Sequence, residues 1–166
     1  MADLHTCTVQ ELTETLTQAE VSALPRVVLG VAPNGGEGLT QEQAGQVEDW
    51  LEAKLTQATD TVVAAVNACE RNPRIAMGKR KVPEAVAYHA LVIARHAVIS
   101  AIPGQSQTLE GSTRAAEYST AQAALAKVAS CDLFVNDYAD STDPDVTGGG
   151  GGVALVNNEE AQDWRW

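Results

Sequence analysis

Apolar side chains recur every three or four residues over about the first 130 positions, which is the spacing of one face of an α-helix. The repeat is most regular from residue 40 to residue 70, where it persists for about six turns. Thr40 and Gln43 have the spacing of a reciprocal N-terminal cap, and Asn72-Pro73 ends the pattern. The sequence therefore predicts a helix over 40–70, on the order of 45 Å long. Its apolar positions are Val47, Leu51, Leu55, Ala58, Val62, Ala65 or Val66, and Cys69.

A shorter helix is predicted ahead of this one. Thr8 and Glu11 again have the spacing of a reciprocal cap, and apolar residues follow at helical spacing. Pro25 is expected to end the helix, because proline lacks the N–H that the helix needs. Residues 25–38 contain the stretch APNGGEG and are interpreted as a loop, with a short strand over 26–31 as an alternative.

Two more helices are predicted after residue 82. One begins near Pro83, a residue that suits the first turn, and runs to about Ile102, just before Pro103-Gly104. It is apolar on nearly every side, which is typical of a central, buried helix. The other begins near Ser112 and is apolar on one face. The predicted fold is therefore all-α: a four-helix bundle-like domain over residues 1–133, with one long helix and a buried third helix.

The composition changes after residue 133. Residues 134–166 are rich in Asp, Gly, Ser and Thr, and glycines fill 148–152, so we expect a flexible acidic arm. One strand is conceivable over 153–156. Disorder is one interpretation of the arm; docking is the other, because aromatic, arginine and apolar side chains are common interface anchors. The candidate docking residues are Val153, Leu155, Val156, Trp164, Arg165 and Trp166.

Charge is distributed unevenly along the chain. The formal net charge of −11 argues against a general nucleic-acid binder. Residues 1–131 carry 14 acidic and 10 basic side chains, whereas 132–166 carry 8 acidic side chains and Arg165 alone. Five basic residues gather in the segment 71–81, which is interpreted either as a solvated loop or as a contact with DNA phosphates or a neighbouring subunit. They are Arg71, Arg74, Lys79, Arg80 and Lys81.

The cysteines and histidines predict no metal site and no disulfide framework. Cys7, Cys69 and Cys131 are odd in number and widely spaced, so we interpret them as small buried side chains, two of them near helix ends. His89 and His96 share a helix face but are roughly 10.5 Å apart along its axis. Because metal–nitrogen bonds are about 2 Å long, one ion cannot bridge them, and core or interface positions are expected.

Neither catalysis nor membrane insertion is indicated. No nucleophile elbow of the GxSxG type occurs, and the glycine run lacks the Lys-Ser/Thr of a phosphate-binding loop, so no enzyme activity and no cofactor are predicted. The longest apolar run, 82–102, is interrupted by Glu84, His89, Arg95 and His96, which excludes a membrane span. No signal peptide is evident, and a cytoplasmic origin is expected.

Three stretches resemble a family of small connectors, the head–tail joining or adaptor proteins of Mu-like phages and prophages. Thr8–Leu12 is similar to the start of that family's first helix. Val82–Val86, followed by Ile93–Arg95, resembles its third helix, and Arg114–Tyr118 its closing helix. The resemblance covers roughly residues 8–133. Two places depart from it: Arg71–Lys81 stands where the family shows Arg-Tyr and Pro-Leu, and Cys131-Asp132 replaces a closing Gly-Lys.

The resemblance implies a structural protein of the virion neck. Such proteins form a ring of identical subunits, commonly a dodecamer, beneath the portal, and they continue the DNA channel toward the next neck or tail-terminator protein. Their C-terminal arms hold the portal, so Trp164 and Trp166 are expected to be portal anchors. DNA would pass without sequence-specific contacts, and a wall of low positive charge would not retain its phosphates.

Two other functions remain open on the sequence. Another neck or tail-completion role would keep the phage assignment and change the partner. An acidic helical regulator that binds a basic host protein would need its acidic residues on one rigid face, whereas the excess lies in the arm. Ring symmetry and the identity of the bound neighbour distinguish these possibilities.

Overall fold

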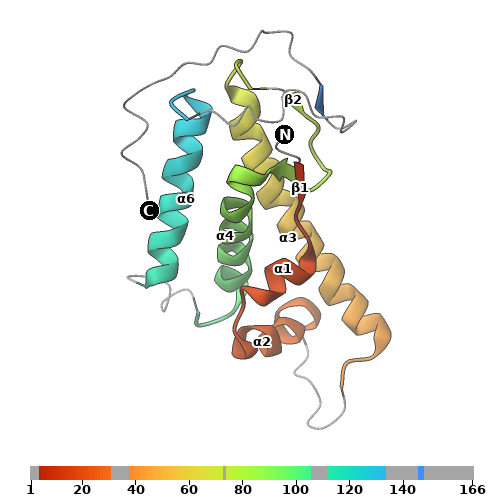
Figure 1. The fold of residues 1–166 in the computed structure, drawn as a ribbon. Coiled ribbons are helices and arrows are strands. Elements are labelled where there is room, and N and C mark those ends of the chain that lie inside the picture. The colour runs from red at the N-terminus through yellow and green to blue at the C-terminus, as the bar shows by residue number, and fades with distance from the viewer. Residues whose placement is uncertain (1–3, 31–37, 73, 106–111, 134–145, 148–166) are drawn as a thin grey trace.

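The computed structural model describes residues 4–30, 38–72, 74–105, 112–133 and 146–147. Helices α3, α4 and α6 lie side by side and run in alternating directions, and α1 and α2 pack at one end of this bundle (Figure 1). The all-α prediction is confirmed. The helices are α1 (Val9–Glu14), α2 (Gln18–Leu29), α3 (Gln41–Ala68), α4 (Glu84–Ala101) and α6 (Thr113–Ala129); the strands are β1 (Leu4–Thr6), β2 (Arg74–Ile75), β3 (Lys81–Pro83) and β4 (Val146–Thr147).

The long helix α3 is the element that the sequence predicted best. The Thr40 hydroxyl accepts a hydrogen bond from the Gln43 N–H, and the Gln43 side chain accepts one from the Thr40 N–H, so the predicted cap is confirmed. The buried face of α3 follows the predicted spacing and packs on both α4 and α6. Its buried apolar residues are Leu51, Leu55, Ala58, Val62, Val63 and Val66.

The predicted first helix is two helices, and this part of the prediction was wrong. α1 ends at Glu14. Thr17 and Glu20 then form a second reciprocal cap, which starts α2 as a separate helix. Pro25 lies inside α2 instead of ending it, and its ring is buried. The helix continues to Leu29 and stops at Gly30, whose φ of 68° is a left-handed conformation that glycine adopts without strain. The alternative strand over 26–31 is therefore wrong where the structure describes it.

Helix α4 packs on both α3 and α6, as expected of the buried third helix. Val86, Val98 and Ile99 are almost fully buried. Tyr88 departs from the prediction, since 57% of its surface is exposed. The rest of the core comes from α1, α2 and α6, through Leu12, Leu24, Leu125 and Val128.

Two short antiparallel pairings tie distant segments to the bundle. β1 pairs with β3, with His5 opposite Val82, so the N-terminal segment is part of the folded body. β2 pairs with β4, with Arg74 opposite Thr147 and Ile75 opposite Val146. The second pairing brings a piece of the C-terminal segment back to the chain that follows α3.

Cys69 and Cys131 form a disulfide, with their Cα atoms 5.2 Å apart, so the prediction of two unlinked buried thiols was wrong. Cys69 is the C-cap of α3, and Cys131 lies just beyond the C-cap of α6. The topology explains the contact, because α3 and α6 run in the same direction and end together at the top of Figure 1. Cys7 is a buried free thiol, as predicted.

Candidate interaction surface

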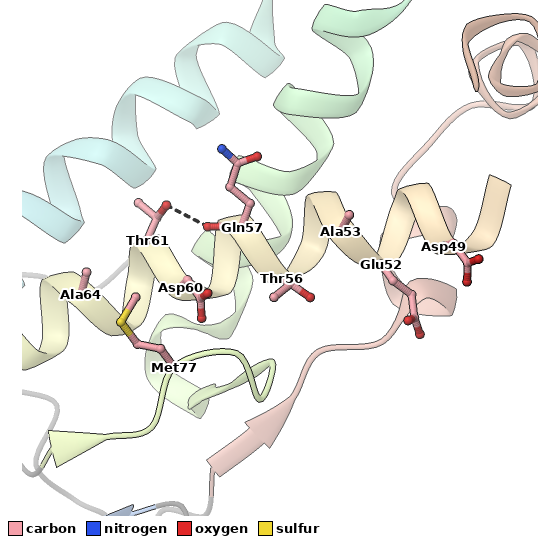
Figure 2. Close-up of a pocket in the computed structure, with 9 residues that line it drawn as sticks. All are labelled: Asp49, Glu52, Ala53, Thr56, Gln57, Asp60, Thr61, Ala64 and Met77. Carbon is pink, nitrogen blue, oxygen red and sulfur yellow. Dashed lines mark hydrogen bonds between the residues drawn. The ribbon is translucent and has the colours of Figure 1, made fainter. Parts of the chain in front are cut away.

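The outward face of α3 forms an open groove along half of the helix (Figure 2). Small and polar side chains make its floor, and three carboxylates and one methionine border it. Met77 reaches over this face from the segment between β2 and β3, and 55% of its surface is exposed. The groove is lined by Asp49, Glu52, Ala53, Thr56, Gln57, Asp60, Thr61, Ala64 and Met77.

The segment 76–80 is fixed to α3 by that helix's carboxylates. The Gly78 N–H donates to Asp60 Oδ1 at 2.6 Å, and Arg80 Nη1 donates to Glu52 Oε1 at 2.9 Å. Gly78 has a φ of 76°, which glycine adopts readily. Arg80 has a φ of 55°, which is uncommon for a residue with a side chain. The Arg80 carbonyl accepts the Cys7 N–H at 2.9 Å, so this strained residue joins α3 to the N-terminal segment.

The five predicted basic residues differ in exposure and in their partners. Arg71, Arg74 and Lys79 are exposed, and Arg80 and Lys81 are half-buried. Arg74 Nη1 donates to the Asn67 carbonyl at 2.6 Å, at the end of α3. Arg80 is engaged with Glu52, as described above. Arg74 and Arg80 therefore contact groups of their own subunit. The prediction that this segment contacts DNA or a neighbouring subunit stays a prediction.

Asn67 is a structural residue that the sequence did not reveal. Its side-chain amide donates to the Ile75 carbonyl and accepts the Ile75 N–H, both at 2.9 Å. The amide thus replaces a strand neighbour for β2, whose Ile75 side chain is buried. Together with the pairing to β4, this holds the C-terminal segment against the end of α3. No sequence signal marked Asn67, because its partner lies eight residues away in a non-helical segment.

The opposite end of the bundle is held by charge. Glu20 of α2, only 6% exposed, forms an ion pair with Arg114 at the start of α6. Burial alone would raise the pKa of the Glu20 carboxyl, but hydrogen bonds from the Thr17 N–H and the Arg114 guanidinium outweigh it, and the pKa is lowered. A second ion pair, between Arg95 and Glu117, joins α4 to α6.

His89 and His96 lie in packed positions, in agreement with their predicted core or interface positions. The His96 ring stacks on Tyr118 of α6, with ring centroids 3.7 Å apart. The His89 Nδ1 atom is buried without a hydrogen-bond partner, and burial lowers the pKa of this ring. Among the described residues, no group of three or more His, Cys, Asp or Glu side chains is placed to hold a metal ion.

The structure bears on the membrane expectation and does not reach the arm's docking residues. Within the described ranges, no helix is long and apolar enough to cross a membrane. The candidate docking residues of the arm lie outside the described residues, and their role stays a prediction. They are Val153, Leu155, Val156, Trp164, Arg165 and Trp166.

The protein family described as "Bacteriophage Mu, Gp36" matches residues 7–153. No curated protein matches the chain. No solved structure matches it either. The matched range reaches beyond residue 133, where the resemblance seen in the sequence stopped, and it ends before Trp164.

Proposed function

We propose that this chain, which belongs to the bacteriophage Mu Gp36 family, is a non-enzymatic structural protein of the virion neck. Its role would be that of a head–tail connector. Identical subunits form a ring under the portal and continue the DNA channel to the next neck or tail-terminator protein. The C-terminal arm docks on the portal through its terminal aromatic residues.

The observation that carries the proposal is the pairing of β4 with β2. Residues 148–166 follow β4 (Val146–Thr147) in the sequence, so they begin next to a point that is paired with the bundle. The Asn67 amide and the disulfide lie at the same end. A paired attachment point followed in sequence by a glycine run and two tryptophans suits a protein that must reach a partner from a fixed point.

The charge distribution supports the same role. The net charge is −11, and Arg80 is neutralised within the subunit by Glu52. Such a surface holds DNA phosphates weakly, which a passage for DNA requires. We assign the segment 71–81 to orienting the base of the arm.

The α3 groove is the surface that we assign to contact between ring neighbours. Met77 is 55% exposed and borders the groove beside Ala53 and Ala64, and the flexible methionine side chain adapts readily to a partner at a binding surface. A ring needs two different surfaces on each subunit, because the same face cannot serve both neighbours in a head-to-tail contact. The groove offers one of them.

Electron microscopy of negatively stained mixtures tests the proposal directly. The full chain and a chain ending at residue 147 would each be mixed with the portal protein of the same phage. We expect rings stacked on portals with the full chain and none with the shortened chain. Trp164→Ala with Trp166→Ala should reproduce the loss, whereas Glu159→Gln with Glu160→Gln keeps the aromatic anchors and should bind.

A matched pair of substitutions tests the ring contact. Ala64→Arg places a large charge in the α3 groove, and Ala116→Arg places the same side chain on the exposed face of α6. We expect only Ala64→Arg to abolish rings, with both variants retaining helical content. Rings that bind a different neck protein would indicate a tail-completion role. Capture of a basic host protein without ring formation would indicate the acidic regulator instead.

A further inference from the structure

The disulfide lies at the one end of the bundle from which the C-terminal segment departs. Cys69 is fully buried, and Cys131 is half-buried. Their bond joins the ends of two helices that have no direct chain connection, across a sequence separation of 62. Figure 1 shows the ends of both helices at the top of the bundle.

Three links lie at this end of the bundle. The disulfide joins the end of α3 to the residue that follows the C-cap of α6, β2 pairs with β4, and the Asn67 amide holds Ile75 of β2. The disulfide is the covalent link of the three, so breaking it would leave this end held by hydrogen bonds and packing.

Cys131 occupies a backbone position that glycine normally takes. Its φ is 66°, and the N–H groups of Asp132 and Leu133 both donate to the Lys127 carbonyl, as at a helix end closed by a left-handed residue. A residue with a Cβ is disfavoured in this conformation. The cysteine therefore does not suit the helix end by itself, and the bond to Cys69 is what this side chain contributes there.

The third thiol is isolated from this pair. Cys7 is fully buried, and burial, with the nearby Glu11 carboxylate adding to it, raises its pKa to about 11. Because only the thiolate attacks a disulfide, Cys7 is a poor competitor in thiol exchange. The exchange chemistry therefore belongs to Cys69 and Cys131.

We propose that Cys69 and Cys131 form a redox-controlled clasp, open as two thiols during assembly and closed as a disulfide in the released particle. The inference rests on the proposed function for its compartments, since a phage protein is made in a bacterial cytoplasm that keeps thiols reduced and then leaves it. Closure fixes the point where the C-terminal segment leaves the bundle. The open form lets that point adjust while the subunit finds its partners.

The chemistry requires an oxidant, and a small disulfide such as oxidised glutathione suffices. The half-buried Cys131 thiolate attacks one glutathione sulfur and releases one glutathione thiolate. Cys69 then loses its proton and attacks the Cys131 sulfur of the mixed disulfide, and the second glutathione leaves. Two protein thiols and one oxidised glutathione give one protein disulfide and two reduced glutathiones.

Alkylation before and after release tests the compartment dependence. Infected cells are quenched and denatured with trichloroacetic acid, which stops thiol exchange, and both their proteins and the released particles are then alkylated under denaturing conditions. The chain in cells should carry three labels, and the chain in particles should carry one, at Cys7. One label in cells, or three in particles, would overturn the switch. Neither count requires portal binding, so failure here is distinct from failure of the connector role.

Amide hydrogen exchange on the purified full-length chain tests what closure does. With oxidised glutathione, exchange over 127–133 and at 74–75 should slow by at least about tenfold relative to the reduced chain. Cys131→Gly keeps the left-handed helix end without the bond and should show the fast exchange in both conditions. Cys7→Ala removes the third thiol and should retain the difference. Equal exchange in the two redox states would show that the bond does not hold this end.

Discussion

The two ends of the bundle are held by different physical means. At the end where α1 and α2 pack, the Glu20–Arg114 ion pair and reciprocal helix caps join the elements. At the other end, a disulfide, the Asn67 amide and a two-residue strand pairing do so. The ion pair responds to pH, and the disulfide responds to redox state. The end with the disulfide is also the end where β4 pairs with β2.

Removing the disulfide should lower the free energy of unfolding more than any other of these changes. Cys69→Ser is expected to lower the free energy of unfolding by about 4 kcal/mol under oxidising conditions, because the bond closes a long loop in the unfolded chain. Urea unfolding followed by circular dichroism measures it. In excess reductant the variant and the parent chain should unfold alike, and a difference that persists there would assign the effect to packing of the side chain.

Removing the Glu20–Arg114 ion pair should lower the free energy of unfolding by a smaller amount. Arg114→Ala leaves the Glu20 carboxylate buried without its cation, and we expect a loss of about 2–3 kcal/mol in the same unfolding measurement. Glu20→Gln with Arg114→Ala removes both charges and should recover part of the loss. If the double variant is no more stable than Arg114→Ala alone, the ion pair is not what joins α2 to α6.

Removing the Asn67 amide should act locally at the covalent end. Asn67→Ala leaves the N–H and carbonyl of Ile75 without their partners, for an expected loss of about 2 kcal/mol. Exchange of the Ile75 amide proton should accelerate, while that of the α2 amides should not. Gln57→Ala, an exposed change on the same helix, serves as the control and should leave both unchanged.

Acid should weaken the charged end first, with the smallest effect of the four. The pKa of Glu20 is lowered in the folded state, so the carboxylate stabilises the fold above its unfolded pKa, which is about 4.3. That stability is lost as the pH falls through the lower folded value. Unfolding free energy measured from pH 6 to pH 3 should decline, and Glu20→Gln should flatten the decline. An unchanged slope would mean that other carboxylates dominate.

The sequence predicted the helices well where one local signal was sufficient. Thr40 and Ser112 marked helix starts that the structure confirms, because a cap depends on residues three positions apart. The break at Thr17 was missed although the same cap signal is present, since Pro25 further on was interpreted as the end of a single helix. Proline usually ends or kinks a helix because it lacks an N–H. In α2, however, Pro25 is buried inside the helix, and the helix continues past it.

The contacts at the covalent end could not be predicted in the same way. The disulfide joins residues 62 positions apart, and only the alternating directions of α3, α4 and α6 bring the two helix ends together. The sequence places both cysteines near helix ends. Together with the helix directions, that position would have predicted the disulfide. The Asn67–Ile75 contact depends on how the chain returns after α3, and local propensity carries no information about that return.

The disulfide also determines how a pull on the C-terminal segment is transmitted. Tension would first separate the two-residue pairing of β4 with β2 and would then reach Cys131. Without the bond, it would peel the last turn of α6 away from its neighbours, one hydrogen bond at a time. With the bond, Cys131 passes the tension to Cys69 and along the 28 residues of α3, the most extensively packed helix described. Under such a pull, the β4–β2 pairing would therefore separate before α6 unravels.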